Sequence, residues 1–185
     1  MKTPSQISAP RPRPRFASRW RAALRTVVAA AVITTLAGGG CRALASRLTL
    51  NLTASMPRGL YWLRPGSPVS RDTTVSLSIP PSIQSLVATR GYLPADFPLL
   101  KRIVAISGDH VCTAGDRYVV GNTVISTIAR HDHVGRPLEP YQFCGAVPTG
   151  YVFLAANGES SLDSRYFGPV AIGALTAAVP IWTFF

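Results

Sequence analysis

An uncharged hydrophobic segment near the N-terminus divides this chain of 185 residues into two unlike parts. Residues 26–41 carry no charged side chain and are rich in valine, alanine, isoleucine and leucine. As a helix this segment would extend about 24 Å, at roughly 1.5 Å per residue, which is short for a membrane span. The flanking Arg25 and Arg42 can reach the headgroups, and a bilayer can thin locally. We therefore expect a membrane anchor or signal segment at residues 26–47, followed by a folded domain at residues 48–185.

Positive charge is concentrated before and around this segment. Residues 1–47 carry nine basic and no acidic side chains, whereas residues 48–185 carry ten basic and eight acidic ones. Prolines among the arginines predict that residues 1–25 form a basic, disordered tail. An arginine-rich flank favours a cytoplasmic N-terminus and an exported remainder. The main domain is close to neutral, so the formal net charge of +11 does not indicate a nucleic-acid-binding face.

The sequence leaves three interpretations of the hydrophobic segment open. It could be an uncleaved signal anchor, a cleaved signal peptide or a buried core helix. Ala43-Leu44-Ala45 has the small-x-small pattern of a cleavage site, so removal after Ala45 is one of the alternatives. The glycines at positions 38–40 are expected to weaken a helix at its outer end.

Short segments with period-two alternation dominate residues 48–185. Together with the absence of a βαβ pattern or a repeat, they predict a mainly antiparallel β domain. Pro81 and Gly91 bound the clearest helix, at residues 81–90. Residues 126–142 are expected to be a loop. Strands are expected at residues 48–53, 59–63, 75–79, 97–106, 111–113, 117–125 (a hairpin with a Gly-Asn turn), 150–156 and within 169–185.

Three cysteines occur, and two of them, Cys112 and Cys144, lie in the main domain. An exported domain meets an oxidising compartment, which favours a Cys112–Cys144 disulfide closing a loop of about 32 residues. The alternative is a pair of free buried thiols.

Lys101 lies in an apolar run that is typical of a buried strand. With period-two alternation it shares a face with Leu99 and Ile103, while Arg102 points the other way. Burial disfavours the charged form of lysine, and a neutral lysine can take a proton from a serine hydroxyl. Ser55, in Ser55-Met56-Pro57 just beyond the hydrophobic segment, is the candidate partner. Taken singly, the two residues are more often a loop serine and a lysine that extends from a sheet edge to water.

Three motifs, in this order, resemble those of the bacterial type I signal peptidases, which are serine–lysine peptidases. They are Thr53-Ala54-Ser55-Met56-Pro57, the run from Lys101 to Gly108-Asp109, and Ser161-Leu162-Asp163-Ser164-Arg165-Tyr166-Phe167-Gly168-Pro169-Val170. A closer likeness is to the conjugative-transfer signal peptidases of the TraF type. It is based on Ser-Met-Pro-Arg-Gly-Leu-Tyr at residues 55–61, Gly-Arg-Pro-Leu at residues 135–138, and two cysteines between Lys101 and the last motif.

The resemblance implies roles for individual side chains. Ser55 would be the nucleophile and Lys101 the general base, and the oxyanion hole would use the Ser55 backbone N–H and the Thr53 hydroxyl. Ser161 would orient the lysine, and Asp163 with Arg165 would brace that motif as an ion pair. No metal or organic cofactor is implied. We interpret His131-Asp132-His133 as a solvated loop rather than a metal site, because no other ligand cluster accompanies it.

The resemblance also implies an antiparallel β-sheet domain of the signal-peptidase type behind an N-terminal transmembrane helix. The protein would be a single-pass protein of the bacterial inner membrane with its catalytic domain in the periplasm. Its partners would be a pilin precursor, or another membrane-inserted preprotein, and the conjugation machinery. In this subgroup the substrate's own N-terminus can release the product as a cyclic pilin. The alternatives are a housekeeping signal peptidase with broad substrates and a non-enzymatic, membrane-anchored subunit of a conjugation or secretion apparatus.

Overall fold

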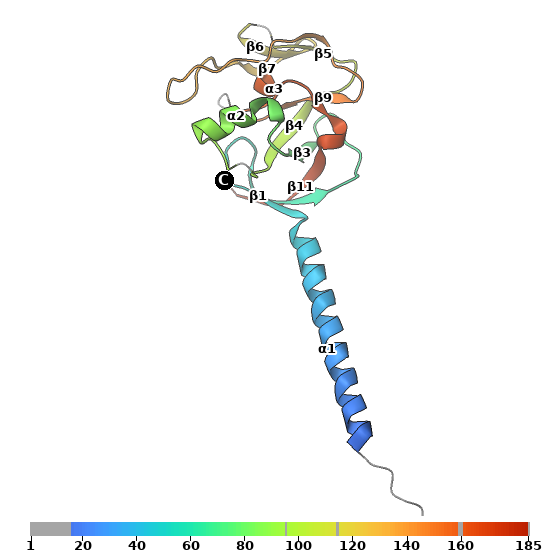
Figure 1. The fold of residues 1–185 in the computed structure, drawn as a ribbon. Coiled ribbons are helices and arrows are strands. Elements are labelled where there is room, and N and C mark those ends of the chain that lie inside the picture. Colours follow the sequence, from blue (N-terminus) through green and yellow to red (C-terminus); the bar gives the residue numbers. More distant parts are fainter. Residues whose placement is uncertain (1–15, 95, 114, 159–160, 185) are drawn as a thin grey trace, which may run out of the picture. The chain divides into compact units, whose positions relative to one another are not determined.

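The computed structural model describes residues 16–184 apart from residues 95, 114, 159 and 160, and it separates into two units. The first unit, residues 1–45, contains helix α1 (Phe16–Ala45). The second unit, residues 46–185, is the β domain, and the two are described separately here (Figure 1).

Helix α1 is longer than the hydrophobic segment suggests. Residues 25–45 are apolar enough to cross a membrane, and these 21 residues correspond to about 31 Å of helix, close to the thickness of a hydrocarbon core. None of the span is buried inside the structure, so the buried core helix is not supported, whereas an anchor and a cleaved leader both remain. The helix also continues through the glycines at positions 38–40, which were expected to weaken it.

Helix α1 also includes residues 16–25, which the sequence analysis assigned to the basic tail. Every proline of the tail lies at or before position 14, and alanine, arginine and leucine, all strong helix formers, follow. The rest of the expected tail, residues 1–15, lies outside the described residues.

The second unit contains two antiparallel sheets, which confirms the predicted fold class. The larger sheet has the strand order β1-β2-β11-β3-β4-β9-β10 and the smaller has the order β7-β6-β5-β8. The smaller sheet lies at the end of the domain opposite to β1 and β11 (Figure 1). The strands are β1 (Leu48–Asn51), β2 (Arg58–Arg64), β3 (Thr74–Leu77), β4 (Leu99–Ala105), β5 (His110–Cys112), β6 (Arg117–Val120), β7 (Thr123–Thr127), β8 (Cys144–Ala146), β9 (Tyr151–Ala155), β10 (Val170–Ala171) and β11 (Thr176–Phe184).

Most elements agree with the sequence pattern. Helix α2 (Pro81–Arg90) has its proline in the first turn, and Gly91 closes it with a φ of 65°, a left-handed conformation that glycine adopts without strain. Strand β8 and helix α3 (Ser164–Phe167) were not predicted. They span three and four residues, too few for a hydrophobic period to appear.

Strand β4 lies near the middle of the larger sheet, between β3 and β9. Leu99 and Ile103 are buried in the core, and Arg102 is exposed, as the alternation predicted. Lys101 is opposite Val75 of β3 and is itself buried. The sheet therefore places one lysine side chain inside the domain.

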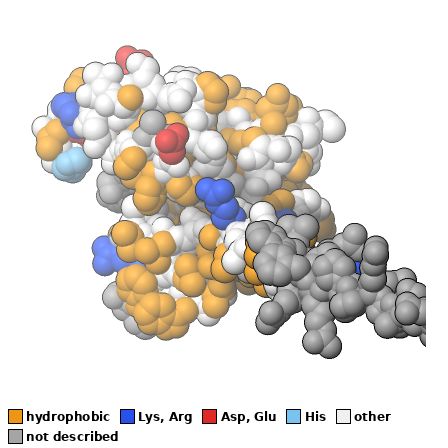
Figure 2. Space-filling model, turned by 60° about the horizontal axis from the view of Figure 1, so that its bottom comes forward, with side chains coloured by type: hydrophobic (Ala, Val, Ile, Leu, Met, Phe, Trp, Pro, Cys, Tyr) orange, Lys and Arg blue, Asp and Glu red, His pale blue; other side chains and the backbone are white. Residues whose placement is uncertain are grey.

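Strand β1 presents its apolar side to the surface. Leu48, Leu50 and Leu52 are exposed, whereas the polar Thr49 and Asn51 are buried. Strand β11 also carries exposed hydrophobic side chains, and hydrophobic side chains cover much of the face of the molecule that Figure 2 presents. The buried polar face of β1 therefore faces the domain and leads directly to the turn that contains Ser55.

Gly59, two residues after Pro57, allows strand β11 to approach this turn closely. Its φ is +153°, and a Cβ at this position would lie 2.1 Å from the Trp182 carbonyl oxygen. Any larger residue would separate β2 from β11. This contact gives a physical reason for the glycine in the Ser-Met-Pro-Arg-Gly motif.

A disulfide joins Cys112 and Cys144, which confirms the predicted pairing. The two cysteines are directly opposite each other on β5 and β8 of the smaller sheet. Cys41, in α1, is a free and exposed thiol.

Candidate active site

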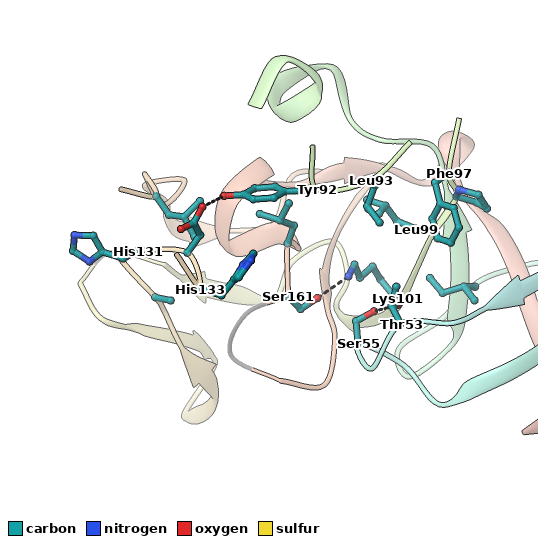
Figure 3. A pocket seen from close by; sticks show the side chains of 16 residues that line it. Thr53, Ser55, Tyr92, Leu93, Phe97, Leu99, Lys101, His131, His133 and Ser161 are labelled. Atoms are coloured by element: carbon teal, nitrogen blue, oxygen red, sulfur yellow. Dashed lines mark hydrogen bonds between the residues drawn. The ribbon is translucent and has the colours of Figure 1, made fainter. Parts of the chain in front are cut away.

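A cavity of about 480 Å³ collects most of the side chains expected to act together. Thr53, Ser55, Lys101 and Ser161 all line it, and Figure 3 shows them close to one another. They come from the turn after β1, from β4 and from the segment that precedes α3. The remainder of the lining is mostly apolar: Tyr92, Leu93, Phe97, Pro98, Leu99, Leu100, Ala129, His131, Asp132, His133, Leu138 and Leu162.

The Ser55 hydroxyl is hydrogen-bonded to Thr53. Their oxygens lie 2.9 Å apart, and the Thr53 hydroxyl donates to Oδ1 of Asn51 over 2.8 Å. A hydroxyl has a single hydrogen, so Ser55 is the donor to Thr53. The backbone of Ser55 is held as well, because its carbonyl accepts from the N–H of Asn157 over 2.7 Å.

Asn51 shapes the turn that carries Ser55, and the sequence analysis missed it. Its amide nitrogen donates to the carbonyls of Thr53, Met56 and Pro57, and its Oδ1 also accepts from the Thr53 backbone N–H. The side chain is 3% exposed. The available signal was the alternation of β1, in which Asn51 is on the face opposite the leucines.

Lys101 is 3% exposed, and its ammonium nitrogen donates a hydrogen bond to the Ser161 hydroxyl over 2.7 Å. Burial lowers the pKa of this lysine from 10.5 to about 8; the charge of Asp163 raises it and that of Arg165 lowers it. Removal from water is the largest cause. A lysine with a pKa near 8 has a substantial neutral fraction at mildly alkaline pH, which is the form able to accept a proton.

Lys101 is the only lysine in residues 48–185, where all the other cationic side chains are arginines. Arginine keeps its charge inside proteins, whereas lysine can lose it when desolvated. The amino-acid composition of residues 48–185 therefore also points to Lys101, independently of the hydrophobic periodicity of its strand.

Asp163 and Arg165 form an ion pair, with 2.8 Å between Oδ1 of Asp163 and Nε of Arg165 and both side chains fully buried. Asp163 caps helix α3 by accepting from the Arg165 backbone N–H over 3.1 Å. The Arg165 guanidinium also donates to the carbonyls of Thr127, Gly158 and Ser161. The last of these bonds connects the ion pair to the residue that contacts Lys101.

The structure brings Thr53, Ser55, Lys101 and Ser161 to one cavity, with Asp163 and Arg165 beside it, and places the disulfide in the other sheet. Among the described residues, the hydrogen bond of Ser55 goes to Thr53 and that of Lys101 goes to Ser161. A direct hydrogen bond between Ser55 and Lys101 is not among those that the described residues make.

Within the described residues, no group of three or more histidine, cysteine, aspartate or glutamate side chains is arranged to hold a metal ion. His131 and His133 are exposed at the edge of the cavity, and Asp132 between them is bonded to tyrosine and arginine. The chemistry that these side chains offer is an alcohol, an amine of lowered pKa and a set of hydrogen-bond donors, facing an apolar cavity.

Comparison with known proteins gives consistent matches. A family model described as signal peptidase, peptidase S26, matches residues 20–183. The conjugal transfer protein TraF of Agrobacterium fabrum is 35% identical over 175 residues, which cover 89% of this chain and 97% of that protein. A probable conjugal transfer protein TraF of Sinorhizobium fredii is 36% identical over 145 residues, which cover 73% of this chain and 77% of that protein. A solved signal peptidase I from Enterococcus faecalis V583 shares 20% identity and covers 61% of this chain and 97% of that chain, with a TM-score of 0.37.

Proposed function

Since the chain belongs to the signal peptidase family, peptidase S26, we propose that it is a membrane-anchored serine endopeptidase in which Ser55 is the nucleophile and Lys101 its general base. The observation that carries this proposal is the buried Lys101, whose lowered pKa accompanies its position on the same cavity as Ser55. Burial lowers the pKa of the amine, so a fraction of Lys101 is neutral and able to accept a proton, and Ser55 is an alcohol that lines the same cavity.

The reaction begins with proton transfer from the Ser55 hydroxyl to the neutral Lys101 amine. The Ser55 oxygen forms a bond to the scissile carbonyl carbon, and the carbonyl oxygen becomes an oxyanion. Protonated Lys101 then gives its proton to the departing amine as the carbon–nitrogen bond breaks, which leaves an acyl-enzyme. Lys101 then takes a proton from a water molecule as its oxygen attacks the ester carbon. The same proton returns to the departing Ser55 oxygen as the ester bond breaks and the acid product is released. If the substrate's own N-terminal amine attacks instead, the product is cyclic.

The oxyanion requires donors that are already in place, and removing one typically costs about 2.7–4 kcal/mol of transition-state stabilisation. The Ser55 backbone N–H and the Thr53 hydroxyl are our candidates. In the resting arrangement the Thr53 proton is directed at Asn51. When Ser55 turns toward Lys101, Thr53 can rotate its hydroxyl hydrogen from Asn51 to the substrate oxygen, while Asn51 keeps the turn in place through its three amide hydrogen bonds.

The relatives and helix α1 support a proposal for the cellular role. Proteins named for conjugal transfer are 35–36% identical to this chain, and we propose that the client is a pilin precursor of a conjugation apparatus. Helix α1 would hold the protein in the inner membrane with the β domain in the periplasm, where the disulfide between β5 and β8 is stable. Anchoring places the cavity close to a precursor that is itself inserted in the membrane, which favours their encounter.

The direct test is to incubate the full-length protein in detergent micelles with candidate pilin precursors and with generic presecretory proteins, and to identify the products by mass spectrometry. We expect cleavage of a pilin precursor at one site. A product lighter than the linear fragment by one water would identify cyclisation. Preferential cleavage of the presecretory proteins would favour the housekeeping alternative, and absence of cleavage of every precursor would contradict the peptidase assignment.

Activity should depend on pH through Lys101. Below a pH of about 8 the lysine is protonated and cannot accept the serine proton, so the rate should fall about tenfold for each pH unit of acidification. Above that pH the amine is neutral and the rate should level off. A pH profile of kcat/KM measures this, and a rate that does not change between pH 6 and about 10 would contradict the role of Lys101.

A further inference from the structure

The cavity has a second end, away from Ser55 and Lys101, that the proposed chemistry does not use. Tyr92, just after α2, forms one part of it, and residues 128–138 form the other. Figure 3 shows Tyr92, His131 and His133 on the opposite side of the cavity from Thr53 and Ser55. We refer to residues 128–138 as the wall segment.

Asp132 joins the two parts of this second end. Its Oδ2 accepts hydrogen bonds from the Tyr92 hydroxyl over 2.5 Å and from Nε of Arg136 over 2.6 Å, and Nη1 of Arg90 lies 3.6 Å away. Its Oδ1 accepts from the backbone N–H groups of Val134 and Arg136. One carboxylate therefore fixes the turn of the wall segment with one oxygen and attaches it to Tyr92 and α2 with the other.

Neighbouring contacts strengthen the attachment. Arg90, the last residue of α2, donates to the Tyr92 hydroxyl over 3.1 Å and to the Pro137 carbonyl over 2.8 Å. The Arg136 guanidinium lies over the Tyr92 ring, 5.3 Å from its centroid. The side chain of Asp132 is only 5% exposed. Although partial burial raises the pKa of Asp132, the hydrogen bonds from Tyr92 and Arg136 hold it below its usual range, so the carboxylate stays charged.

These contacts also account for the Gly-Arg-Pro-Leu motif at residues 135–138. Gly135 adopts a left-handed φ of 83° in the turn, Arg136 pairs with Asp132, the Pro137 carbonyl accepts from Arg90, and Leu138 lines the cavity. Each residue of the motif holds or forms the wall. Nothing in this set contacts Ser55, Lys101 or Ser161 through a hydrogen bond that the structure describes.

From this arrangement we propose that Asp132 is a positioning residue that locks the wall segment against Tyr92 and thereby shapes the subsite that binds the substrate away from the scissile bond. This proposal rests on the proposed peptidase function. A fixed wall presents a preformed surface to an extended, mainly apolar stretch of substrate, so it lowers the cost of ordering that surface on binding. A loosened wall would bind the same stretch less tightly and leave proton transfer at Ser55 unchanged.

The test compares Asp132→Asn with the wild type as full-length proteins. The asparagine carbonyl can keep the backbone bonds of Oδ1, whereas its NH₂ group cannot accept from Tyr92 or Arg136. On the precursor cleaved by the wild type, we expect KM to rise about tenfold while kcat changes less than about twofold. Hydrogen exchange should become about tenfold faster at residues 131–138 and stay unchanged in β4 and β9.

Two further variants distinguish the loss of the Asp132 contacts with Tyr92 and Arg136 from a general loss of charge or stability. Asp116→Asn also removes a carboxylate paired with an arginine near this segment, but Asp116 is 85% exposed, so KM and exchange should not change. Tyr92→Phe removes only the hydroxyl, and its effect should not add to that of Asp132→Asn.

Unchanged exchange at residues 131–138 in Asp132→Asn, or a fall in kcat with constant KM, would overturn the proposal. So would full additivity of Tyr92→Phe with Asp132→Asn. If the wild type cleaves no precursor, the proposed function fails, and hydrogen exchange alone then decides whether Asp132 holds the wall.

Discussion

Replacing Ser55 by alanine, or Lys101 by methionine, should reduce precursor cleavage by about 10⁴-fold or more, because under the proposed mechanism each removes a group that takes part in bond making. The two losses should not add, since neither residue works without the other. The Ser55→Ala, Lys101→Met double variant should be about as inactive as either single one. The measurement is single-turnover cleavage of the precursor, followed by mass spectrometry.

In Lys101→Met the thermal stability should be retained although the activity is lost. Lys101 is buried and its burial disfavours the charged form. Methionine fills a similar volume without an amine to desolvate, so Lys101→Met should unfold at a temperature equal to or above that of the wild type. Loss of cleavage without loss of stability separates a catalytic role from a structural one.

Arg102 provides the matched control on the same strand. It is the next residue along β4, is exposed, and is 3.9 Å from Asp72, a weak surface pair. Arg102→Met should therefore leave cleavage within about twofold of wild type. Equal losses in the Lys101 and Arg102 variants, or full activity of Ser55→Ala, would show that this cavity does not carry the reaction.

The sequence predicted the β4 environment of Lys101 because alternation along a strand is a local property. Leu99, Ile103 and Arg102 occupy the faces that period two assigns to them. The same reasoning predicted α2, whose proline and glycine mark its ends. Strand alternation and helix-end residues can both be recognised from a few consecutive positions of the sequence.

The hydrogen-bond network around Ser55 and Lys101 was not predictable in this way. Asn51 contacts the turn through its side-chain amide, and Ser161 meets Lys101 across 60 positions of sequence, a pairing suggested only by the family resemblance. Asp132 accepts a hydrogen bond from Tyr92, which is 40 positions away in the sequence. Side-chain hydrogen bonds between distant segments leave no periodic trace, so the charged His131-Asp132-His133 stretch was interpreted as a solvated loop although its aspartate is nearly buried.

The largest effect on stability should come from Asp163→Asn. Both members of the Asp163–Arg165 pair are fully buried, and removing one partner leaves an uncompensated charge inside the domain. Such a change typically costs about 3–5 kcal/mol of unfolding free energy. Moreover, the asparagine NH₂ would face the Arg165 guanidinium and the Ala156 N–H, which are both donors. Thermal unfolding of the full-length protein in detergent measures the loss.

Asp109→Asn is the control, because Asp109 pairs with Arg71 over 2.6 Å while remaining 24% exposed. It should cost about 0–1 kcal/mol. A loss in Asp163→Asn no larger than this would mean that Arg165 is stabilised sufficiently without Asp163, for example through the carbonyls of Thr127, Gly158 and Ser161.

The same substitution also tests the electrostatics of the site, provided that the variant is assayed below its unfolding temperature. The charge of Asp163 raises the pKa of Lys101 and that of Arg165 lowers it. Asp163→Asn removes the first influence and keeps the second, so the pKa of Lys101 should fall below about 8 and the pH profile of cleavage should shift toward acid. A purely structural brace would lower the amount of folded protein without moving the profile, whereas a shift toward acid would show that Asp163 acts on the charge of the Lys101 amine.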